Sequence, residues 1–303
     1  MGAFKDQLDR LIKGHIECVD NWRDGRLYHI APLPFISAFM EGTLESGKDM
    51  TQDGATYNFS SPIFSGLSHA ADSLAAIKKL CFEDNAIELP EMLDAVRDNW
   101  RDKEPLRRLA MTRAPAYGND VDYTDDIARE IVEFLVEKTS QYSAVVKNRK
   151  LRFPPGLGTF GRFIGMGEIT GATADGRLAG QPIGCNASPS LGRAVSGPTA
   201  ALNSYCKLPL ADLPSGAPLD IALENRPGVL EQLEPFIESF VQQRGGLLTI
   251  SVNDCEKLRA AREEPEKHRD LVVRVGGWQA YFVDLPPEMQ DWQIKKCETF
   301  ADA

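Results

Sequence analysis

The sequence has little that would bind nucleic acid or a membrane. Its 303 residues include 34 Lys and Arg against 44 Asp and Glu, a formal net charge of −10. A surface that follows phosphates needs clustered Lys and Arg, and a solvated helix end explains the only basic cluster, 147–152. No apolar run approaches the roughly 18 residues of a membrane span, and the N-terminus is too polar for a signal peptide. We therefore expect a cytoplasmic protein with no nucleic-acid or membrane partner.

Cysteine and histidine are sparse and scattered. The four histidines are dispersed, and the six cysteines form neither a Cys-x-x-Cys pair nor the regular spacing of a disulfide scaffold or zinc site. We therefore expect no disulfide framework and assign no metal ligand. The cysteines are Cys18, Cys81, Cys185, Cys206, Cys255 and Cys297.

The apolar residues that are present recur at the spacings of helices and short strands. With 43% hydrophobic and 26% charged residues, the composition is that of a packed domain. Helical spacing predicts helices at 3–23, 66–83, 91–100, 121–147, 230–243 and 255–263. Residues 247–252 read as a buried strand and 271–275 as a second strand. This alternation predicts an α/β architecture.

The segment Leu271–Phe282 reads LVVRVGGWQAYF, with two glycines between a β-type run and an aromatic stretch. Taken alone, the glycine pair favours a hairpin turn. The segment resembles the radical loop of glycyl radical enzymes, the pyruvate formate-lyase superfamily, whose pattern is Arg-Val-any-Gly-aromatic. The resemblance implies that Gly277 carries the radical, with the loop supported by Arg274, Val275, Gly276 and Trp278.

The proposed radical chemistry requires glycine for a physical reason. A backbone Cα radical is stabilised when its centre is planar and shares the unpaired electron with the neighbouring amide groups. A Cβ would clash with the flanking peptides in that arrangement, and glycine has none.

The resemblance extends over nearly the whole chain, because blocks similar to those of the family occur in the same order. They are Pro32–Pro34, Gly47–Asp49, Gly54–Asn58, Ala71–Lys78, Tyr117–Asp120, Gly171–Arg177, Ser188–Ala200 and Leu258–Glu266.

The family fold that this implies is a ten-stranded α/β barrel made of two five-stranded half-barrels. A cysteine loop and a glycine loop enter its centre from opposite ends. The chain would supply the second half-barrel over residues 1–245 and the glycine radical domain over 246–303. A half-barrel exposes strand edges and apolar surface, so an obligate partner is expected.

The radical-accepting cysteine of the family lies upstream of the block that Pro32–Pro34 matches, and none of the six cysteines lies in a similar segment. We expect a split enzyme, in which a separate polypeptide supplies the thiyl cysteine and most of the substrate pocket. The alternatives are a spare part that repairs an oxygen-damaged glycyl radical enzyme, and a truncated chain. The full second half of the sequence favours the split enzyme.

The mechanism implied by the resemblance needs no cofactor bound to this chain. A radical S-adenosylmethionine activase removes a hydrogen atom from Gly277, whose radical then takes one from the partner's cysteine. The thiyl radical abstracts hydrogen from a small-molecule substrate, and a bond such as C–O, C–N, C–S or C–C breaks. A dehydratase or related C–X lyase is the preferred class, whereas a decarboxylase or a fumarate-adding synthase remains open.

Two further motifs have alternative interpretations. Gly156, Gly158 and Gly161 match the Gly-x-Gly-x-x-Gly pattern of dinucleotide sites. No hydrophobic strand precedes them, so a glycine-rich family loop is the simpler interpretation. Arg177 is suited either to a substrate carboxylate or to a structural ion pair, and the second is favoured. The adjacent Asp125 and Asp126 are expected at a solvated helix end.

Some positions depart from the family pattern. Trp278 stands where tyrosine or phenylalanine is usual, Ala174 replaces a common proline, and Thr43 occupies a frequent cysteine position. These departures indicate an unusual branch, so a substrate is not inferred from well-known members.

Overall fold

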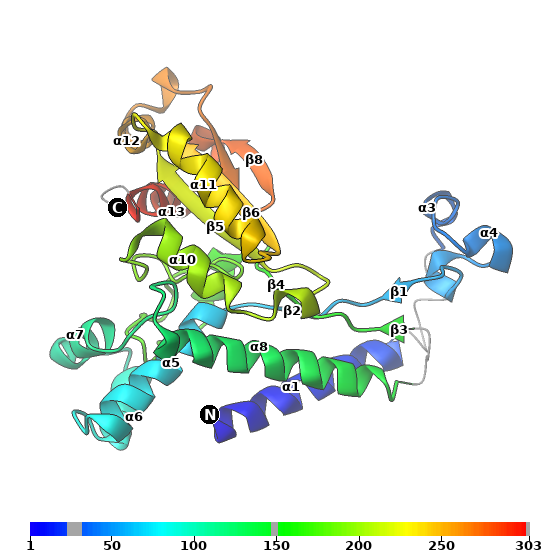
Figure 1. The fold of residues 1–303 in the computed structure, drawn as a ribbon, viewed down its shortest axis with the longest axis horizontal. Coiled ribbons are helices and arrows are strands. Elements are labelled where there is room, and N and C mark those ends of the chain that lie inside the picture. Colours follow the sequence, from blue (N-terminus) through cyan, green and yellow to red (C-terminus); the bar gives the residue numbers. More distant parts are fainter. Residues whose placement is uncertain (23–31, 147–150, 301–303) are drawn as a thin grey trace. The chain divides into compact units, whose positions relative to one another are not determined.

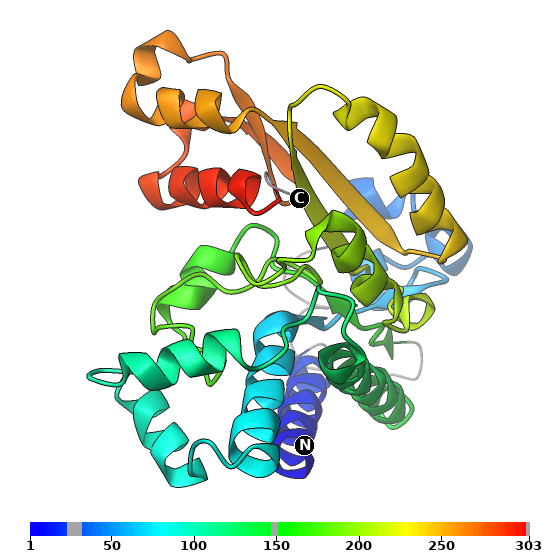
Figure 2. The ribbon, with the colours of Figure 1, turned by 60° about the vertical axis from the view of Figure 1, so that its left-hand side comes forward.

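The computed structural model describes residues 1–22, 32–146 and 151–300 (Figures 1 and 2). They form two compact units, each assembled from separate stretches of chain. The first unit contains 1–63, 131–156 and 212–215, and the second contains 64–130, 157–211 and 216–303. The predicted helix end at 147 and most of the basic cluster 147–152 lie outside the described residues.

The first unit is built on α1 (Gly2–Trp22) and the C-terminal part of α8 (Asp122–Ser143). Ile16 of α1 is buried, and the Tyr142 hydroxyl of α8 donates to Asp9 of α1 over 2.8 Å (Figure 1). The helices predicted at 3–23 and from 121 are thereby confirmed. The unit also contains α3 (Pro34–Ser37), α4 (Thr43–Ser46), η2 (Met50–Gln52) and the parallel strands β1 (Asn58–Phe59) and β3 (Leu151–Arg152).

Helices α5 (Leu67–Ile77) and α6 (Leu89–Arg97) of the second unit confirm two further predictions. A π-helical segment, η3 (Lys78–Glu83), continues α5. Leu80 of this segment and Met92 of α6 are fully buried in one core. Helix α7 (Glu104–Thr112) contributes Ala110 to the same core. The unit also contains α9 (Phe163–Glu168) and α10 (Gly197–Cys206). The chain passes from one unit to the other within β2 (Ile63–Phe64), β4 (Gly156–Leu157) and η4 (Leu210–Asp212).

A parallel strand pair forms the largest sheet of the second unit. In it β5 (Pro218–Glu224) pairs with β6 (Leu247–Asn253), and α11 (Val229–Gln242) connects them along one face (Figure 1). Such a crossover is what parallel strands require, and it confirms the α/β class. The sequence analysis missed β5, whose residues Leu219–Ala222 are buried in succession, as is typical of a covered parallel strand.

The prediction that β6 is buried is wrong. No residue of β6 is fully buried. Its only strand partner among the described residues is β5, so one edge of β6 is not covered by another strand. The predicted domain boundary at 245/246 lies between α11 and β6, and the division into 1–245 and 246–303 stays a prediction.

The C-terminal part of the second unit begins with α12 (Cys255–Glu263), which the sequence predicted with these bounds. It continues with η5 (Pro265–Lys267), β7 (Val272–Val275), β8 (Trp278–Tyr281), η6 (Phe282–Asp284) and α13 (Pro287–Glu298). Against expectation, a disulfide joins Cys255 to Cys297. Among the helices described, none has the length and apolar character needed to cross a membrane.

Asp125 is also placed differently from the expectation. Its side chain is fully buried rather than solvated, and it accepts hydrogen bonds from Lys207 (2.8 Å) and Ser204 (3.0 Å). Burial raises the pKa of Asp125, and these two partners oppose the rise. Sequence position at a helix start did not reveal that α10 and Lys207 would cover it.

A second buried carboxyl, Asp72 of α5, links this helix to the loop before α8. It accepts the backbone N–H of Tyr117 over 2.7 Å, while the Nε of Arg193 lies 4.0 Å away. Burial raises the pKa of Asp72 to about 8, although the Tyr117 N–H and the Arg193 charge oppose the rise. Near neutral pH the Asp72 carboxyl therefore keeps its proton in the folded protein, whereas in the unfolded chain it has lost it.

This difference predicts a loss of stability as the pH rises towards 8. Between pH 6 and pH 9 the wild-type protein should lose roughly 3 kcal/mol of unfolding free energy through Asp72, because each pKa unit corresponds to about 1.4 kcal/mol. Asp72→Asn stays neutral, so urea unfolding at the two pH values should show a correspondingly smaller loss. Asp94→Asn, at an exposed position on α6, is the control and should follow the wild type. An unchanged pH dependence in Asp72→Asn would contradict the prediction.

Candidate functional site

The predicted radical loop is the turn of a β-hairpin. Strands β7 and β8 pair antiparallel, with Val275 opposite Trp278, so that Gly276 and Gly277 form a two-residue connection. The hairpin and the radical-loop interpretations therefore describe the same structure. All five predicted site residues lie at or beside this turn.

Alternate side chains of β7 are buried and attach the hairpin to an apolar core. Val273 and Val275 are buried with Phe282 and Leu285, whereas Val272 is exposed. This period of two is the expected pattern of a strand with one covered face. Arg274 lies on the other face, half-buried, and no hydrogen-bond partner is present for its Nε.

Two glutamines of α13 hold the base of the hairpin. The Gln293 side-chain amide donates to the carbonyl of Arg274 over 2.9 Å. Gln290 donates to the carbonyls of Phe282 (3.0 Å) and Leu285 (2.9 Å) just after β8. Both glutamines are buried. Sequence reasoning missed them, because nothing in a polar helix indicates which amide will reach a strand.

The two glycines of the turn have different constraints. Gly276 has a φ of +55°, and a Cβ added to it would lie 3.3 Å from the backbone nitrogen of Gly161. Gly277 lacks a positive φ, is exposed, and has no atom within 4 Å of the position of a Cβ. The fold therefore requires glycine at 276, whereas no steric contact of this chain requires it at 277.

Phe160 and Gly161, at the end of the glycine-rich segment 156–161, lie against the hairpin. Gly161 approaches Gly276, and a Cβ on Gly161 would lie 3.4 Å from the indole nitrogen of Trp278. The segment begins with the two-residue strand β4, and the helix that follows, α9, has only six residues. This arrangement agrees with a structural loop and not with a dinucleotide site.

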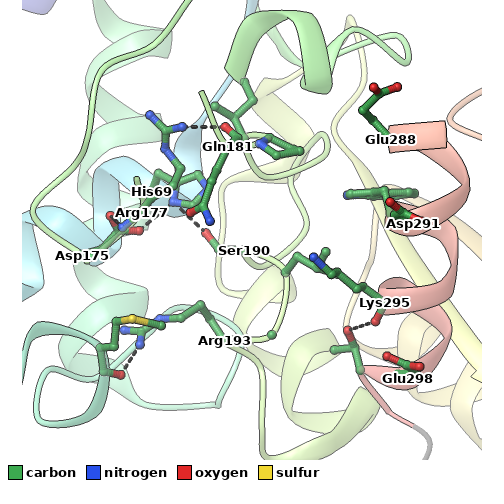
Figure 3. A pocket seen from close by; sticks show the side chains of 18 of the residues that line it. His69, Asp175, Arg177, Gln181, Ser190, Arg193, Glu288, Asp291, Lys295 and Glu298 are labelled. Carbon is green, nitrogen blue, oxygen red and sulfur yellow. Dashed lines mark hydrogen bonds and ion pairs between the residues drawn. The ribbon is translucent and has the colours of Figure 1, made fainter. Parts of the chain in front are cut away.

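A cavity of about 680 Å³, lined by charged and apolar side chains, lies on the face of α13 that does not contact the hairpin (Figure 3). Glu288, Asp291, Trp292 and Lys295 line one side, at the spacing of a single helix face. The opposite wall comes from α5, α7 and the segment 175–193. Thus α13 holds the hairpin with one face and borders the cavity with another.

A histidine is fixed at the cavity wall. The Nδ1 of His69 lies 2.6 Å from a carboxylate oxygen of Asp175 and 3.3 Å from the Ser190 hydroxyl (Figure 3). Burial would raise the pKa of Asp175, but hydrogen bonds from His69 and Thr173 outweigh it and lower the pKa. Since Asp175 and Ser190 approach the same ring nitrogen, they do not form a serine–histidine–aspartate relay, which uses both nitrogens.

Arg177 is occupied by the backbone. Its guanidinium donates to the carbonyls of Gln181 (2.6 Å), Leu178 (3.2 Å) and Thr170 (3.3 Å), and also to Gly171. These bonds favour a structural role for Arg177 over a substrate-binding one, but its hydrogen-bond acceptors are backbone carbonyls and not the carboxylate of the predicted ion pair.

Comparison with known proteins identifies the family. A sequence model described as "Pyruvate formate lyase-like" matches residues 1–161, and one described as "Glycine radical" matches residues 184–283, which include the hairpin. The chain belongs to the pyruvate formate lyase-like family of glycyl radical enzymes.

Its relatives in this family include lyases. The chain is 34% identical over 282 residues to (2S)-3-sulfopropanediol dehydratase of Klebsiella oxytoca, covering 89% of this chain and 33% of that protein. It is also 34% identical over 241 residues to isethionate sulfite-lyase of Bilophila wadsworthia, covering 77% and 28%. Glycerol-bound B12-independent glycerol dehydratase of Clostridium butyricum has a TM-score of 0.90 and 35% identity, over 98% of this chain and 38% of that one.

These comparisons confirm the predicted family and fold class. The chain has the fold of the matching part of a glycyl radical enzyme, and it spans about a third of the length of these relatives. Within the described residues, no cluster of His, Cys, Asp and Glu has the arrangement of a metal site.

The unequal constraints on the two turn glycines predict unequal effects of alanine. Gly276→Ala should lower the unfolding free energy by about 1–3 kcal/mol, because its φ is positive and its Cβ would crowd Gly161. Gly277→Ala should remain within about 0.5 kcal/mol of the wild type, as open surface positions do. Urea unfolding of both variants measures the difference, and equal losses would contradict it.

Proposed function

We propose that this chain is the radical-bearing part of a glycyl radical lyase and that Gly277 is the radical residue. The observation that carries the proposal is the exposed Gly277 at the hairpin tip, at a position where the fold itself does not demand glycine. The absence of a steric role leaves this glycine available for chemistry that needs an unsubstituted Cα, and its place in the Arg-Val-any-Gly-aromatic pattern points to the radical. The match to the "Glycine radical" description over 184–283 supports the same residue.

The proposed reaction begins with a radical S-adenosylmethionine activase, a separate enzyme with its own iron–sulfur cluster. It removes one hydrogen atom from the Gly277 Cα. The Gly277 radical then takes a hydrogen atom from a cysteine thiol, regenerating glycine and leaving a thiyl radical. The thiyl radical abstracts a substrate hydrogen and the target bond breaks. The thiol returns a hydrogen atom to the product radical and becomes a thiyl radical again. The thiyl radical then takes a hydrogen atom from Gly277, which restores the thiol and the glycyl radical together.

In this proposal Gly276 sets the turn, Val275 anchors it in the core, and Arg274 and Trp278 position its two sides. Gln293 assists by fixing the Arg274 carbonyl. The chain's contribution is orientation, because hydrogen transfer requires the reacting atoms in contact. An active site must also exclude water, and the exposed hairpin alone does not do so.

A cysteine-bearing partner would complete the site. Gly277 and the adjacent Trp278 (47% exposed) are exposed at the turn, and Val272 (47%) and Tyr281 (52%), which pair at the open end of the hairpin, are exposed as well. Leu230 and Val241 of α11 are exposed as well. Apolar surface of this kind marks a contact with another protein surface. We propose that a polypeptide with the cysteine loop and first half-barrel covers it.

The proposed reaction class is elimination of a substituent from a small molecule, as in a dehydratase or related C–X lyase. The relatives named dehydratase and sulfite-lyase support this class, and the substrate itself is left open. The cytoplasm is the proposed location, because the activase consumes S-adenosylmethionine, which is made there.

Electron paramagnetic resonance tests the radical assignment. After anaerobic treatment with the activase and S-adenosylmethionine, the wild type should give a doublet, because the one remaining Cα hydrogen splits the signal. Gly277→Ala should fold and give no doublet. Gly171→Ala is the matched control, because Gly171 also lacks a positive φ and nearby atoms, and it should keep the signal. A doublet in Gly277→Ala would refute the assignment.

Anaerobic purification of the tagged chain from its native host tests the partner. We expect a stoichiometric second polypeptide with a cysteine loop and a first half-barrel, identified by mass spectrometry. Recovery of a full-length glycyl radical enzyme instead would indicate the repair role. Recovery of the chain alone would contradict the proposed partner.

A further inference from the structure

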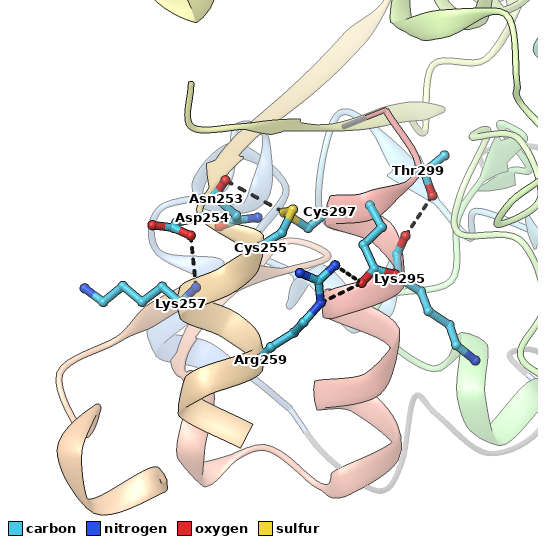
Figure 4. The surroundings of a disulfide bond; sticks show 9 residues. Asn253, Asp254, Cys255, Lys257, Arg259, Lys295, Cys297 and Thr299 are labelled. Atoms are coloured by element: carbon cyan, nitrogen blue, oxygen red, sulfur yellow. Dashed lines mark hydrogen bonds and ion pairs between the residues drawn. A yellow bond between two sulfur atoms is a disulfide. The ribbon is translucent and has the colours of Figure 1, made fainter. Parts of the chain in front are cut away.

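The disulfide between Cys255 and Cys297 connects the two helices that flank the glycine hairpin (Figure 4). Cys255 is the first residue of α12, and Cys297 lies in the last turn of α13. The two cysteines are 42 residues apart in sequence. The covalent loop that they close contains β7, β8 and the turn with Gly277.

Both cysteines belong to the core that holds the hairpin. They are 2% and 0% exposed, and they share a cluster with Val273 and Val275 of β7. The same helix α13 carries Gln290 and Gln293, whose amides hold the base of the hairpin. A change in the attachment of α13 will therefore change the mobility of the strands beside Gly277.

The other polar links between α12 and α13 are weak. Arg259 pairs with Glu298 over 2.6 Å and Arg262 with Asp291 over 3.2 Å, but all four side chains are more than a third exposed. Exposed ion pairs contribute little to stability. The disulfide is the sole covalent cross-link among the described residues, and it adds to the apolar core and the glutamine hydrogen bonds that also attach α13.

The reduced state can also be accommodated. The Cys297 sulfur lies 3.8 Å from the carbonyl oxygen of Asn253, to which a thiol at this position is able to donate. In a reducing compartment a disulfide is usually transient and redox-sensing. The remaining described cysteines, Cys18, Cys81, Cys185 and Cys206, are free thiols, so this pair is the one disulfide among the described residues that reduction can open.

We propose that Cys255 and Cys297 form a reversible redox clasp that controls the order of the glycine hairpin. Oxidation by a peroxide breaks both S–H bonds and forms the S–S bond, and the two protons and two electrons convert H₂O₂ to two molecules of water. Reduction by a dithiol proceeds by thiol–disulfide exchange and releases the covalent link between α13 and α12. In the oxidised state the hairpin is ordered, and in the reduced state its mobility increases.

This inference goes beyond the proposed function and does not depend on the radical. It concerns the mobility of residues 272–281, which is measurable in the resting protein. The Gly277→Ala variant retains both cysteines, so its clasp should respond like that of the wild type even though it forms no radical. Failure of one proposal is therefore distinguishable from failure of the other.

Hydrogen exchange with mass spectrometry tests the clasp in the full chain. After treatment with H₂O₂, thiol titration should find two fewer thiols than after dithiothreitol. Reduction should speed amide exchange in residues 272–281 and 287–298 by roughly tenfold, as local opening becomes easier. Exchange in α5, in the same compact unit, should stay unchanged.

Variants provide matched controls. Cys297→Ser and Cys255→Ser should each exchange like the reduced wild type under both conditions. Cys18→Ser, which removes an exposed free thiol, should keep the full redox response. The comparison of oxidised and reduced wild type remains decisive if the serine variants fail to fold. Equal exchange of the hairpin in both states, no loss of two thiols, or a parallel increase in α5 would each overturn the proposal.

Discussion

The hairpin that carries Gly277 depends on its attachment to α13. Gln290 and Gln293 donate buried amide hydrogens to carbonyls at its base, and a buried carbonyl without a donor is costly. Val273 and Val275 add apolar contacts from the same side. Strand β7 and the residues after β8 are therefore fixed, while the turn with Gly277 is exposed.

The opposite wall of the cavity shows how the chain orders loops with charged groups. Arg177 binds carbonyls between residues 170 and 181, and Asp175 binds His69 and the N–H of Arg177. These groups hold an irregular segment in one conformation, because each buried carbonyl or carboxylate acquires a donor. The charge-bearing residues of this region are thus largely structural. The residue proposed for the chemistry is a glycine with no side chain, and helix α13 contacts both regions.

Six helices and two strands were predictable from the sequence, whereas helices such as α7, α9 and α10 and strands such as β1 and β5 were not. Helix α12 was predicted with its observed bounds, and α1, α5 and α11 to within a few residues, because their apolar residues recur at helical spacing. The hairpin turn was predictable from two glycines between β-type runs. Strand β5 was missed, and β6 was wrongly expected to be buried. Burial depends on which strands and helices cover a segment, and the residues of the segment itself do not specify those neighbours.

The sequence by itself determined the family, the α/β class, and Gly277 as the candidate residue, because local patterns and short motifs carry that information. Tertiary structure alone decided which turn glycine is sterically required, since that depends on the approach of Gly161, more than a hundred residues away. It also decided that Gln290 and Gln293 hold the hairpin and that Cys255 meets Cys297. Contacts between residues distant in sequence arise only when the chain packs, and they are what turns a glycine motif into a positioned site.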